Sequence, residues 1–199
     1  MRKLIVLSFI TLDGVVQAPG LPQEDTSGGF KFGGWTVPYF DEFLDNVMSE
    51  QMGHPFDLLL GRTTYDIFAA FWPQRSGATA GALNKATKYV VSHKPMKSDW
   101  DTTVNISGDV AGEIRKLKSG SGPELQVHGS GNLIHTLLKN DLVDEIWLKT
   151  FPVVLGTGKK LFPDGAVPAR FNVEKTGVSP SGVLIANYER AGEVKTGSF

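Results

Sequence analysis

The amino-acid sequence predicts an α/β protein with a three-layer α/β/α arrangement and a mixed, mostly parallel sheet that ends in a C-terminal antiparallel hairpin. Two observations indicate this class. Short, almost wholly apolar strand-like segments alternate with amphipathic helical segments, which is typical of parallel crossover units covered on both faces. Near the C-terminus, two strand-like segments flank a turn sequence, which predicts the hairpin.

The predicted strands are short runs rich in β-branched and aliphatic residues. TVNI at residues 103–106 is a weaker candidate than the others. Segment 143–154 alternates in polarity, and its Pro152 suggests an edge strand or a strand end. Residues 179–182, SPSG, supply the hairpin turn. The strands are expected at residues 3–10, 57–60, 88–92, 103–106, 124–129, 143–154, 170–178 and 182–190.

The predicted helices place their apolar residues at helical spacing. In the first, Pro38 lies near a first-turn position. In the second, Thr63 and Thr64 can cap the N-terminus, and Pro73 stops the helix. Residues 17–37, before the first helix, contain five glycines and two prolines, and a loop of this length is usually functional or mobile. The helices are expected at residues 38–52, 63–72, 109–118 and 131–139.

Length and composition indicate one domain. The chain has 199 residues, of which 41% are hydrophobic, and this is enough for one substantial core. We assign residues 1–190 to a single domain and residues 191–199 to a C-terminal tail. The 20 basic and 21 acidic residues give a net charge of −1, which argues against nucleic acid as a partner.

The sequence also favours a cytoplasmic location. The first apolar run, KLIVLSFI, ends at residues 11–14, TLDG, without a small-residue cleavage site, so we interpret it as a strand and not as a signal peptide. No apolar stretch approaches the ~18 residues that span a bilayer, so no membrane partner is expected. The chain has no cysteine, which fits a reducing compartment.

A first candidate binding site lies in LLLGRTTYDIF, residues 58–68, where a buried strand ends and a helix begins. Gly61 lets the backbone turn close to a ligand. Thr63 and Thr64 can donate to an anion, and Arg62 adds a planar set of donors suited to a phosphate. The free N–H groups and the helix dipole favour negative charge at the same place. The alternative is simple helix capping, with Arg62 in solvent.

A second candidate is LQVHGSGNLIHTLL, where a strand exits into Gly129, Ser130 and Gly131. This turn, continued by Asn132 and Leu133, would let a diphosphate approach the helix N-terminus. The dinucleotide fingerprint G-x-G-x-x-G is incomplete, because residue 134 is isoleucine. G-x-S-x-G is also absent, because residue 128 is histidine. A tight structural turn is the alternative reading.

Two anion sites on one sheet suit a dinucleotide better than a single phosphate. One would hold the bridging diphosphate, and the other, with its arginine, a ribose 2′-phosphate, which points to NADP and not NAD. A third strand end provides Ser92, His93 and Lys94 for the adenosine side. An ordinary polar loop is the alternative for these three residues.

Five segments appear in the same order as in one known family: FITLDGVV, LLLGRTTYDIF, YVVSHK, VHGSGNLIHTLL and DEIWLKTFPVVLGTGKKLF. The chain resembles members of the dihydrofolate-reductase-like superfamily over nearly all of residues 1–190. More narrowly, it resembles the C-terminal reductase domain of the bifunctional deaminase-reductases of riboflavin biosynthesis. The zinc motif of the deaminase half, H-x-E with P-C-x-x-C, is not in this sequence.

The resemblance implies an NADPH-binding reductase built on a mixed sheet of eight or nine strands. It implies that residues 61–64 meet the adenosine-side phosphate and that residues 129–133 meet the diphosphate. It also implies that the turn at residues 12–14 lies beside the nicotinamide and the substrate, and that residues 155–158 close another part of the cleft.

Asp13 is the first candidate for the proton step, because it would lie beside the expected nicotinamide. To donate a proton near neutral pH it needs a raised pKa, which burial against an aromatic residue could provide. The alternative is an aspartate that forms the turn before Gly14. Dihydrofolate reductases use a carboxylate on the first helix, and Asp41, Glu42 and Asp45 are available there, but none of them is singled out.

The substrate side is less specific. Trp35 and Leu155 are candidate substrate contacts, and Trp72 could also stack on a planar ring, although core packing or a dimer seam is the alternative for each tryptophan. The four histidines have no metal-ligand spacing, so no metal site is expected. We expect a homodimer, because related domains pair and because Trp147 and Phe151 lie on a strand that could be exposed.

The sequence therefore predicts an NADPH-dependent reductase that transfers hydride to a small planar heterocycle, pterin-like or aminopyrimidine-like. The competing hypothesis is a module that binds NADP(H) or another nucleotide without turnover.

Overall fold

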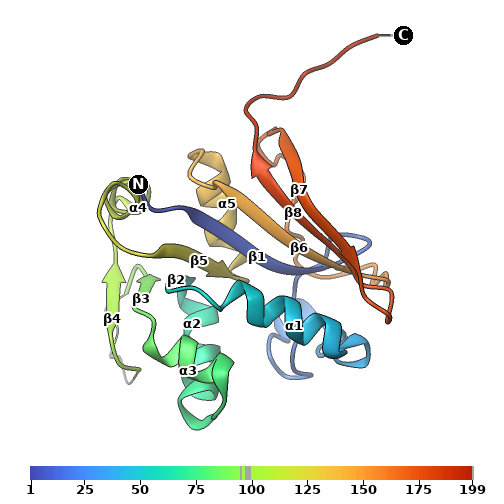
Figure 1. Ribbon diagram of the computed structural model, residues 1–199, viewed down its shortest axis with the longest axis horizontal. Helices are drawn as coiled ribbons and strands as arrows, with labels where there is room; N and C mark the ends of the chain where they lie inside the picture. The colour runs from blue at the N-terminus through green and yellow to red at the C-terminus, as the bar shows by residue number, and fades with distance from the viewer. Residues whose placement is uncertain (95, 97–99, 199) are drawn as a thin grey trace.

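The computed structural model describes residues 1–94, 96 and 100–198, and these residues form one eight-stranded sheet. Its strands are β1 (Leu4–Thr11), β2 (Phe56–Gly61), β3 (Lys88–Val91), β4 (Thr103–Ile106), β5 (Glu124–His128), β6 (Glu145–Phe151), β7 (Phe171–Val178) and β8 (Leu184–Arg190). Their order across the sheet is β4-β3-β2-β5-β1-β6-β8-β7 (Figure 1). β1 to β6 pair in parallel, whereas β8 runs antiparallel to both β6 and β7. The mixed sheet and its C-terminal hairpin are thus confirmed.

Five α-helices lie in the described part of the chain, and short 3₁₀ turns accompany them. The helices are α1 (Glu42–Gln51), α2 (Arg62–Phe71), α3 (Ala78–Lys85), α4 (Val110–Ser119) and α5 (Gly131–Lys139). The 3₁₀ turns are η1 (Ser27–Gly29), η2 (Val37–Tyr39) and η3 (Trp72–Gln74). None of the helices in the described ranges is long and apolar enough to span a bilayer.

The helices form two layers, one on each face of the sheet (Figure 1). Alternate residues of β2 show this directly, because Leu59 packs with α4 and α5, whereas Leu58 and Leu60 pack with α2 and α3. α1 packs through Leu44 on the face of β6 and β8 to which Phe151 points. The three-layer α/β/α arrangement predicted from the sequence is therefore confirmed.

The start of α2 differs from the prediction. Gly61 is its N-cap and the helix begins at Arg62, so neither Thr63 nor Thr64 caps it. At the other end, Pro73 lies inside η3, which continues the chain beyond α2 as a 3₁₀ turn. Proline is tolerated in the first turn of a helical segment, where its missing N–H leaves no bond unmade.

The other helices show two further differences. Pro38 lies in η2, and α1 starts later, where the Asp41 carboxylate accepts a hydrogen bond from Leu44 N–H at 2.9 Å. α3 was not predicted, because its sequence, ATAGALNK, is dominated by small residues and buries only Ala80 and Leu83. Such a segment has too weak an apolar pattern to be recognised locally.

Candidate functional site

Two strand exits meet at one edge of the sheet. β2 and β5 are parallel neighbours, with Leu58 opposite Gln126, so their carboxyl ends lie together. α2 follows β2 directly, and two residues separate β5 from α5. Ser130 Oγ accepts a hydrogen bond from Gly61 N–H at 3.0 Å, which ties one turn to the other. The two turns predicted as anion sites are therefore adjacent.

A groove of about 560 Å³ opens over both turns. Ser92 does not line it: the side chain is buried, and its hydroxyl donates to the Lys94 carbonyl at 2.9 Å and accepts from Lys94 N–H at 3.2 Å. Lys94 does not line the groove either, but the other predicted cofactor residues all do. These residues are Gly61, Arg62, Thr63, Thr64, His93, Gly129, Ser130, Gly131, Asn132 and Leu133.

The N-termini of α2 and α5 both open on this groove without a side-chain cap. Gly61 has no side chain to offer, and Ser130 makes no capping hydrogen bond. Gly129 and Ser130 have left-handed backbones, with φ of 56° and 60°, which turns the chain sharply after β5. A Cβ added at Gly131 would meet nothing within 4 Å, so the space over α5 is open. Two uncapped helix N-termini in one groove are suited to anionic groups.

Cationic side chains add positive charge to the groove beside the two helix N-termini. Arg62 is 42% exposed, and its Nε lies 2.8 Å from both carboxylate oxygens of Asp66. Lys159 and Lys160 also line the groove, where Lys159 Nζ pairs with Asp25 at 2.6 Å. Arg62 therefore reaches the groove as one partner of an exposed ion pair, which a phosphate would have to replace or join.

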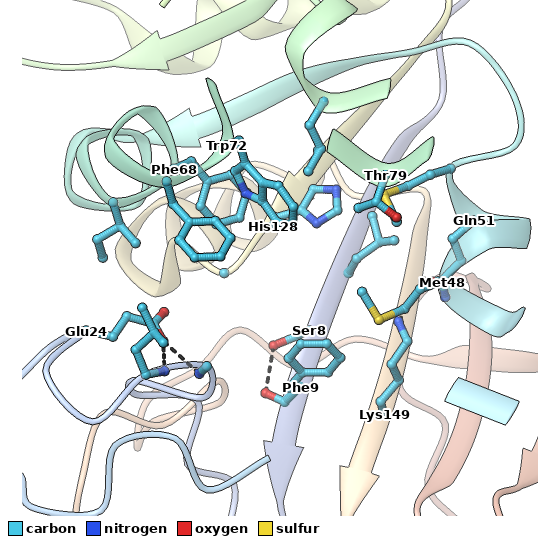
Figure 2. Close-up of a pocket in the computed structure, with 18 residues that line it drawn as sticks. Ser8, Phe9, Glu24, Met48, Gln51, Phe68, Trp72, Thr79, His128 and Lys149 are labelled. Atoms are coloured by element: carbon cyan, nitrogen blue, oxygen red, sulfur yellow. Dashed lines mark hydrogen bonds between the residues drawn. The ribbon is translucent and has the colours of Figure 1, made fainter. Parts of the chain in front are cut away.

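A second cavity of about 260 Å³ adjoins the groove, and Phe68 and His128 line both. Its walls are mainly apolar and come from α1, α2, α3 and β1. Figure 2 shows Phe68 and Trp72 on one side of this cavity and Phe9 on another. Trp72 is thus placed where it can contact a planar ring, as the stacking hypothesis requires.

Polar side chains lie on the floor of the second cavity. Lys149 Nζ donates to Gln51 Oε1 at 2.6 Å, and desolvation lowers the pKa of Lys149 to about 7. His128 Nε2 lies 3.0 Å from Gln126 Oε1. Desolvation, and then the charge of Lys149, lower the pKa of His128 well below its ordinary value. The imidazole is therefore neutral at pH 7.

A family model for the RibD C-terminal domain matches residues 2–185. The chain belongs to the RibD C-terminal domain family. Two relatives from Bacillus subtilis are the uncharacterized proteins YyaP and YwjB. YyaP is 26% identical over 192 residues, covering 92% of each chain. YwjB is 26% identical over 164 residues, covering 81% of this chain and 83% of the relative.

Solved structures share the fold of this RibD C-terminal domain. A putative riboflavin biosynthesis protein from Shewanella sp. PV-4 has a TM-score of 0.74 at 24% identity, over 96% of this chain and 99% of that one. A pyrimidine reductase-like protein from Corynebacterium diphtheriae has a TM-score of 0.66 at 13% identity, over 96% and 93%.

A third solved structure also shares the fold. It is a dihydrofolate reductase from Enterococcus faecalis complexed with NADP(H) and RAB-propyl, with a TM-score of 0.60 at 16% identity over 94% of this chain and 96% of that one. The resemblance predicted from the sequence is confirmed. The family and the fold together support a reductase-type fold for this chain.

Asp13 lies in the turn after β1 and lines neither cavity. Its carboxylate accepts hydrogen bonds from Thr11 Oγ1 at 2.5 Å, from Leu155 N–H at 3.2 Å and from Gly156 N–H at 2.7 Å. Desolvation raises the pKa of Asp13, but these hydrogen bonds outweigh it, so the pKa is lowered. Proton donation requires the opposite shift. In this RibD C-terminal domain, the structure favours the turn-forming interpretation of Asp13.

The two predicted substrate contacts also lie elsewhere. Trp35 is buried, its Nε1–H donates to the Gln17 carbonyl at 2.8 Å, and its ring packs edge-on against Phe151 at 5.3 Å. Leu155 packs against the same apolar cluster, and neither side chain lines the groove or the second cavity. Trp35 therefore anchors the loop at residues 17–37 to the sheet. This corresponds to the core-packing interpretation of Trp35 and not to a substrate contact.

The first helix contributes different chemistry from the expected carboxylate. Asp41, Glu42 and Asp45 line neither cavity, whereas Met48 and Gln51 line the second one. Asp41 is used as the α1 N-cap. A thioether and an amide therefore occupy the face of α1 that borders the cavity.

The interpretation of β6 as an exposed strand is wrong. β6 lies between β1 and β8, and Pro152 follows its last residue, so the proline marks a strand end and not a sheet edge. Phe151 is fully buried and cannot contribute to a dimer surface. Lys149 lies two residues before Phe151 and therefore on the same buried face of the strand. A lysine at a buried strand position is the sequence feature that could have indicated the cavity floor.

Proposed function

We propose that this chain is an NADPH-dependent reductase of a small planar heterocycle. NADPH would bind in the groove, with its diphosphate at the N-terminus of α5 and its 2′-phosphate near Arg62, Thr63 and Thr64. The heterocycle would bind in the adjoining cavity, between Phe68 and Trp72 and the floor formed by Lys149.

One observation carries the proposal: the uncapped N-termini of α2 and α5 share a groove that adjoins an apolar cavity. The groove fits the phosphates, since it combines free N–H groups, two threonine hydroxyls and cations, with open space over Gly131. Uncapped helix ends otherwise lower stability, so a ligand that supplies acceptors there compensates for the missing caps.

When bound, NADPH supplies the hydride, and the chain supplies position and surroundings. The two turns fix the phosphates, and the tie between Ser130 and Gly61 holds the turns in register. The apolar walls, with Phe68 and Trp72, exclude water from the ring that accepts the hydride.

Arg62→Ala tests the cofactor assignment. We expect its Kd for NADPH to rise by about tenfold or more, because a hydrogen bond to a charged group contributes about 1.5–3 kcal/mol. Its Kd for NADH should change little, because NADH has no 2′-phosphate. Fluorescence titration of both nucleotides measures this. Arg75→Ala is the matched control, since Arg75 stacks on Phe71 and does not line the groove. Equal losses for NADPH and NADH would show that Arg62 does not contact the 2′-phosphate.

Turnover separates the reductase from the competing binding module. The absorbance of NADPH is followed with a panel of pterins and aminopyrimidines. The reductase proposal expects oxidation of NADPH with at least one of them. Tight NADPH binding without oxidation on any compound would favour the module that binds NADP(H) without turnover.

A further inference from the structure

Lys149 is a buried lysine at the floor of the second cavity. Its side chain comes from the middle of the sheet, is 2% exposed, and lies with Nζ 5.4 Å from the centre of the Phe9 ring. It takes part in none of the ion pairs among the described residues. An ammonium has three N–H donors, and in the described part of the structure only Gln51 Oε1 accepts one of them.

Gln51 adds an unused donor at the same place. Its side chain lines the cavity from α1, and the residue is 5% exposed. Its Oε1 accepts from Lys149, but its Nε2 has no hydrogen-bond partner among the described residues. Because Oε1 and Nε2 belong to one amide, the free donor lies next to the ammonium. Buried donors without partners are destabilising, so an acceptor atom of a bound ligand would stabilise the free donors of Lys149 and Gln51.

Among the described residues, no other side chain of the cavity accepts a hydrogen bond from Lys149 Nζ or Gln51 Nε2. Its other ionisable groups are Glu24 and His128. Glu24 Oε2 accepts from Gly20 N–H at 2.7 Å, and Figure 2 places Glu24 across the cavity from Lys149. His128 donates from Nε2, because the Gln126 amide uses its own Nε2 toward Gln51 carbonyl and Glu124.

We propose that Lys149 and Gln51 form an acceptor-binding subsite, which holds a carbonyl or carboxylate oxygen of a planar ring bound in the cavity. This inference rests on the proposed function and deepens it, because it names the group of the substrate that the cavity floor would hold. The oxygen would accept from Lys149 Nζ and Gln51 Nε2, with the ring against Phe68 and Trp72.

The subsite also predicts what the cavity rejects. A ring that placed an amidinium or a protonated amino group on the cavity floor would set its positive charge against Lys149. The carboxylate that lines the cavity, Glu24, lies across it and already accepts from Gly20 N–H and Leu21 N–H. Repulsion by a buried like charge is strong, because the surroundings screen it poorly. Lys149 and Gln51 therefore determine specificity for acceptor groups over cationic donors.

Ring probes test the subsite in the full chain without NADPH. Calorimetry at pH 6, where Lys149 carries its proton, measures the binding of benzoate, acetophenone and benzamidinium. Benzoate presents an anionic oxygen, acetophenone a neutral carbonyl and benzamidinium a cation of similar size. We expect benzoate or acetophenone to bind at least about tenfold more tightly than benzamidinium, the loss expected for one hydrogen bond to a charged group.

Two variants identify the residues responsible. Lys149→Met and Gln51→Leu should each raise the Kd of the preferred oxygen probe by about tenfold or more, because each removes one hydrogen bond of the charged subsite. Lys116→Met, the same substitution on the exposed face of α4, is the control and should bind like the wild type. Circular dichroism melting identifies a variant that does not fold, and the wild-type preference among probes is then decisive.

Three results would overturn the subsite: benzamidinium binding as tightly as the oxygen probes, unchanged oxygen-probe binding in both variants, or no probe binding at millimolar concentration. NADPH titration of the same samples keeps the two proposals separate. Intact NADPH binding with failed probes rejects the subsite alone, whereas probe binding without NADPH binding rejects the cofactor assignment.

Discussion

Lys149 shows how one buried charge links stability to pH. Desolvation lowers its pKa from 10.5 to about 7 in the folded chain, whereas the unfolded chain exposes it to water. Between these values the unfolded state binds more protons than the folded state. The free energy of unfolding therefore rises with pH through this window, as far as Lys149 is concerned.

Lys149→Met should remove this dependence. We expect the wild-type free energy of unfolding to rise more steeply from pH 7 to pH 9 than that of the variant, by about 1 kcal/mol per pH unit for one titrating group. Urea unfolding at pH 7, 8 and 9 measures both slopes. Lys88, whose pKa burial lowers to about 8, acts in the same direction but is present in both proteins, so it cancels in the comparison. Parallel slopes would contradict the desolvation of Lys149.

At the scale of elements, Ser130 joins the two helix-starting turns. Its hydroxyl accepts from Gly61 N–H, and it also donates to the His128 carbonyl at 3.3 Å. Its left-handed backbone is a conformation that glycine adopts without strain and serine does not. The Ser130 hydroxyl thus connects the β2–α2 and β5–α5 turns, whereas the left-handed backbone of Ser130 is strained.

Ser130→Ala and Ser130→Gly separate these two contributions. Both variants lose the hydrogen bond to Gly61, and this loss should lower the free energy of unfolding of each variant by about 1 kcal/mol. Glycine also relieves the left-handed strain, so Ser130→Gly should be more stable than Ser130→Ala by about 1 kcal/mol. Urea unfolding of the three proteins at one pH provides the comparison. If the two variants were equally stable, strain at Ser130 would not contribute.

At the scale of the whole molecule, the β7 edge of the sheet is the surface on which we expect a second copy. Among the described residues β7 is an edge strand, and its Val173 and Val178 are 57% and 61% exposed. Leu184 of β8, opposite Val178, is 50% exposed. An open strand edge with apolar side chains favours pairing with another chain. This surface replaces Phe151 as the basis for the expected homodimer.

Light scattering after size exclusion tests the dimer. We expect a particle of twice the chain mass, and Val178→Lys should shift it toward the single chain, because a charge on the edge opposes strand pairing. Glu193→Lys in the C-terminal tail is the control with the same new side chain. A wild-type mass near 21.6 kDa would contradict the homodimer.

The sequence by itself determined the features that depend on local pattern. The apolar strands, the amphipathic helices, the closing hairpin and the glycine turns after β2 and β5 all follow from neighbouring residues, because periodicity and turn chemistry act over a few positions. The two turns that we predict as anion sites were recognisable for the same reason. α3 was missed because its small residues carry little periodicity.

Tertiary structure decided which side chains meet. Lys149 and Gln51 are 98 positions apart, and Asp13 and Gly156 are 143 apart, so no local pattern could pair them. The first pair lies at the floor of a cavity, and the second pair holds the turn after β1. A side chain acquires its protonation state and its partners from burial and from chain segments brought together by folding, and these are properties of packing in three dimensions.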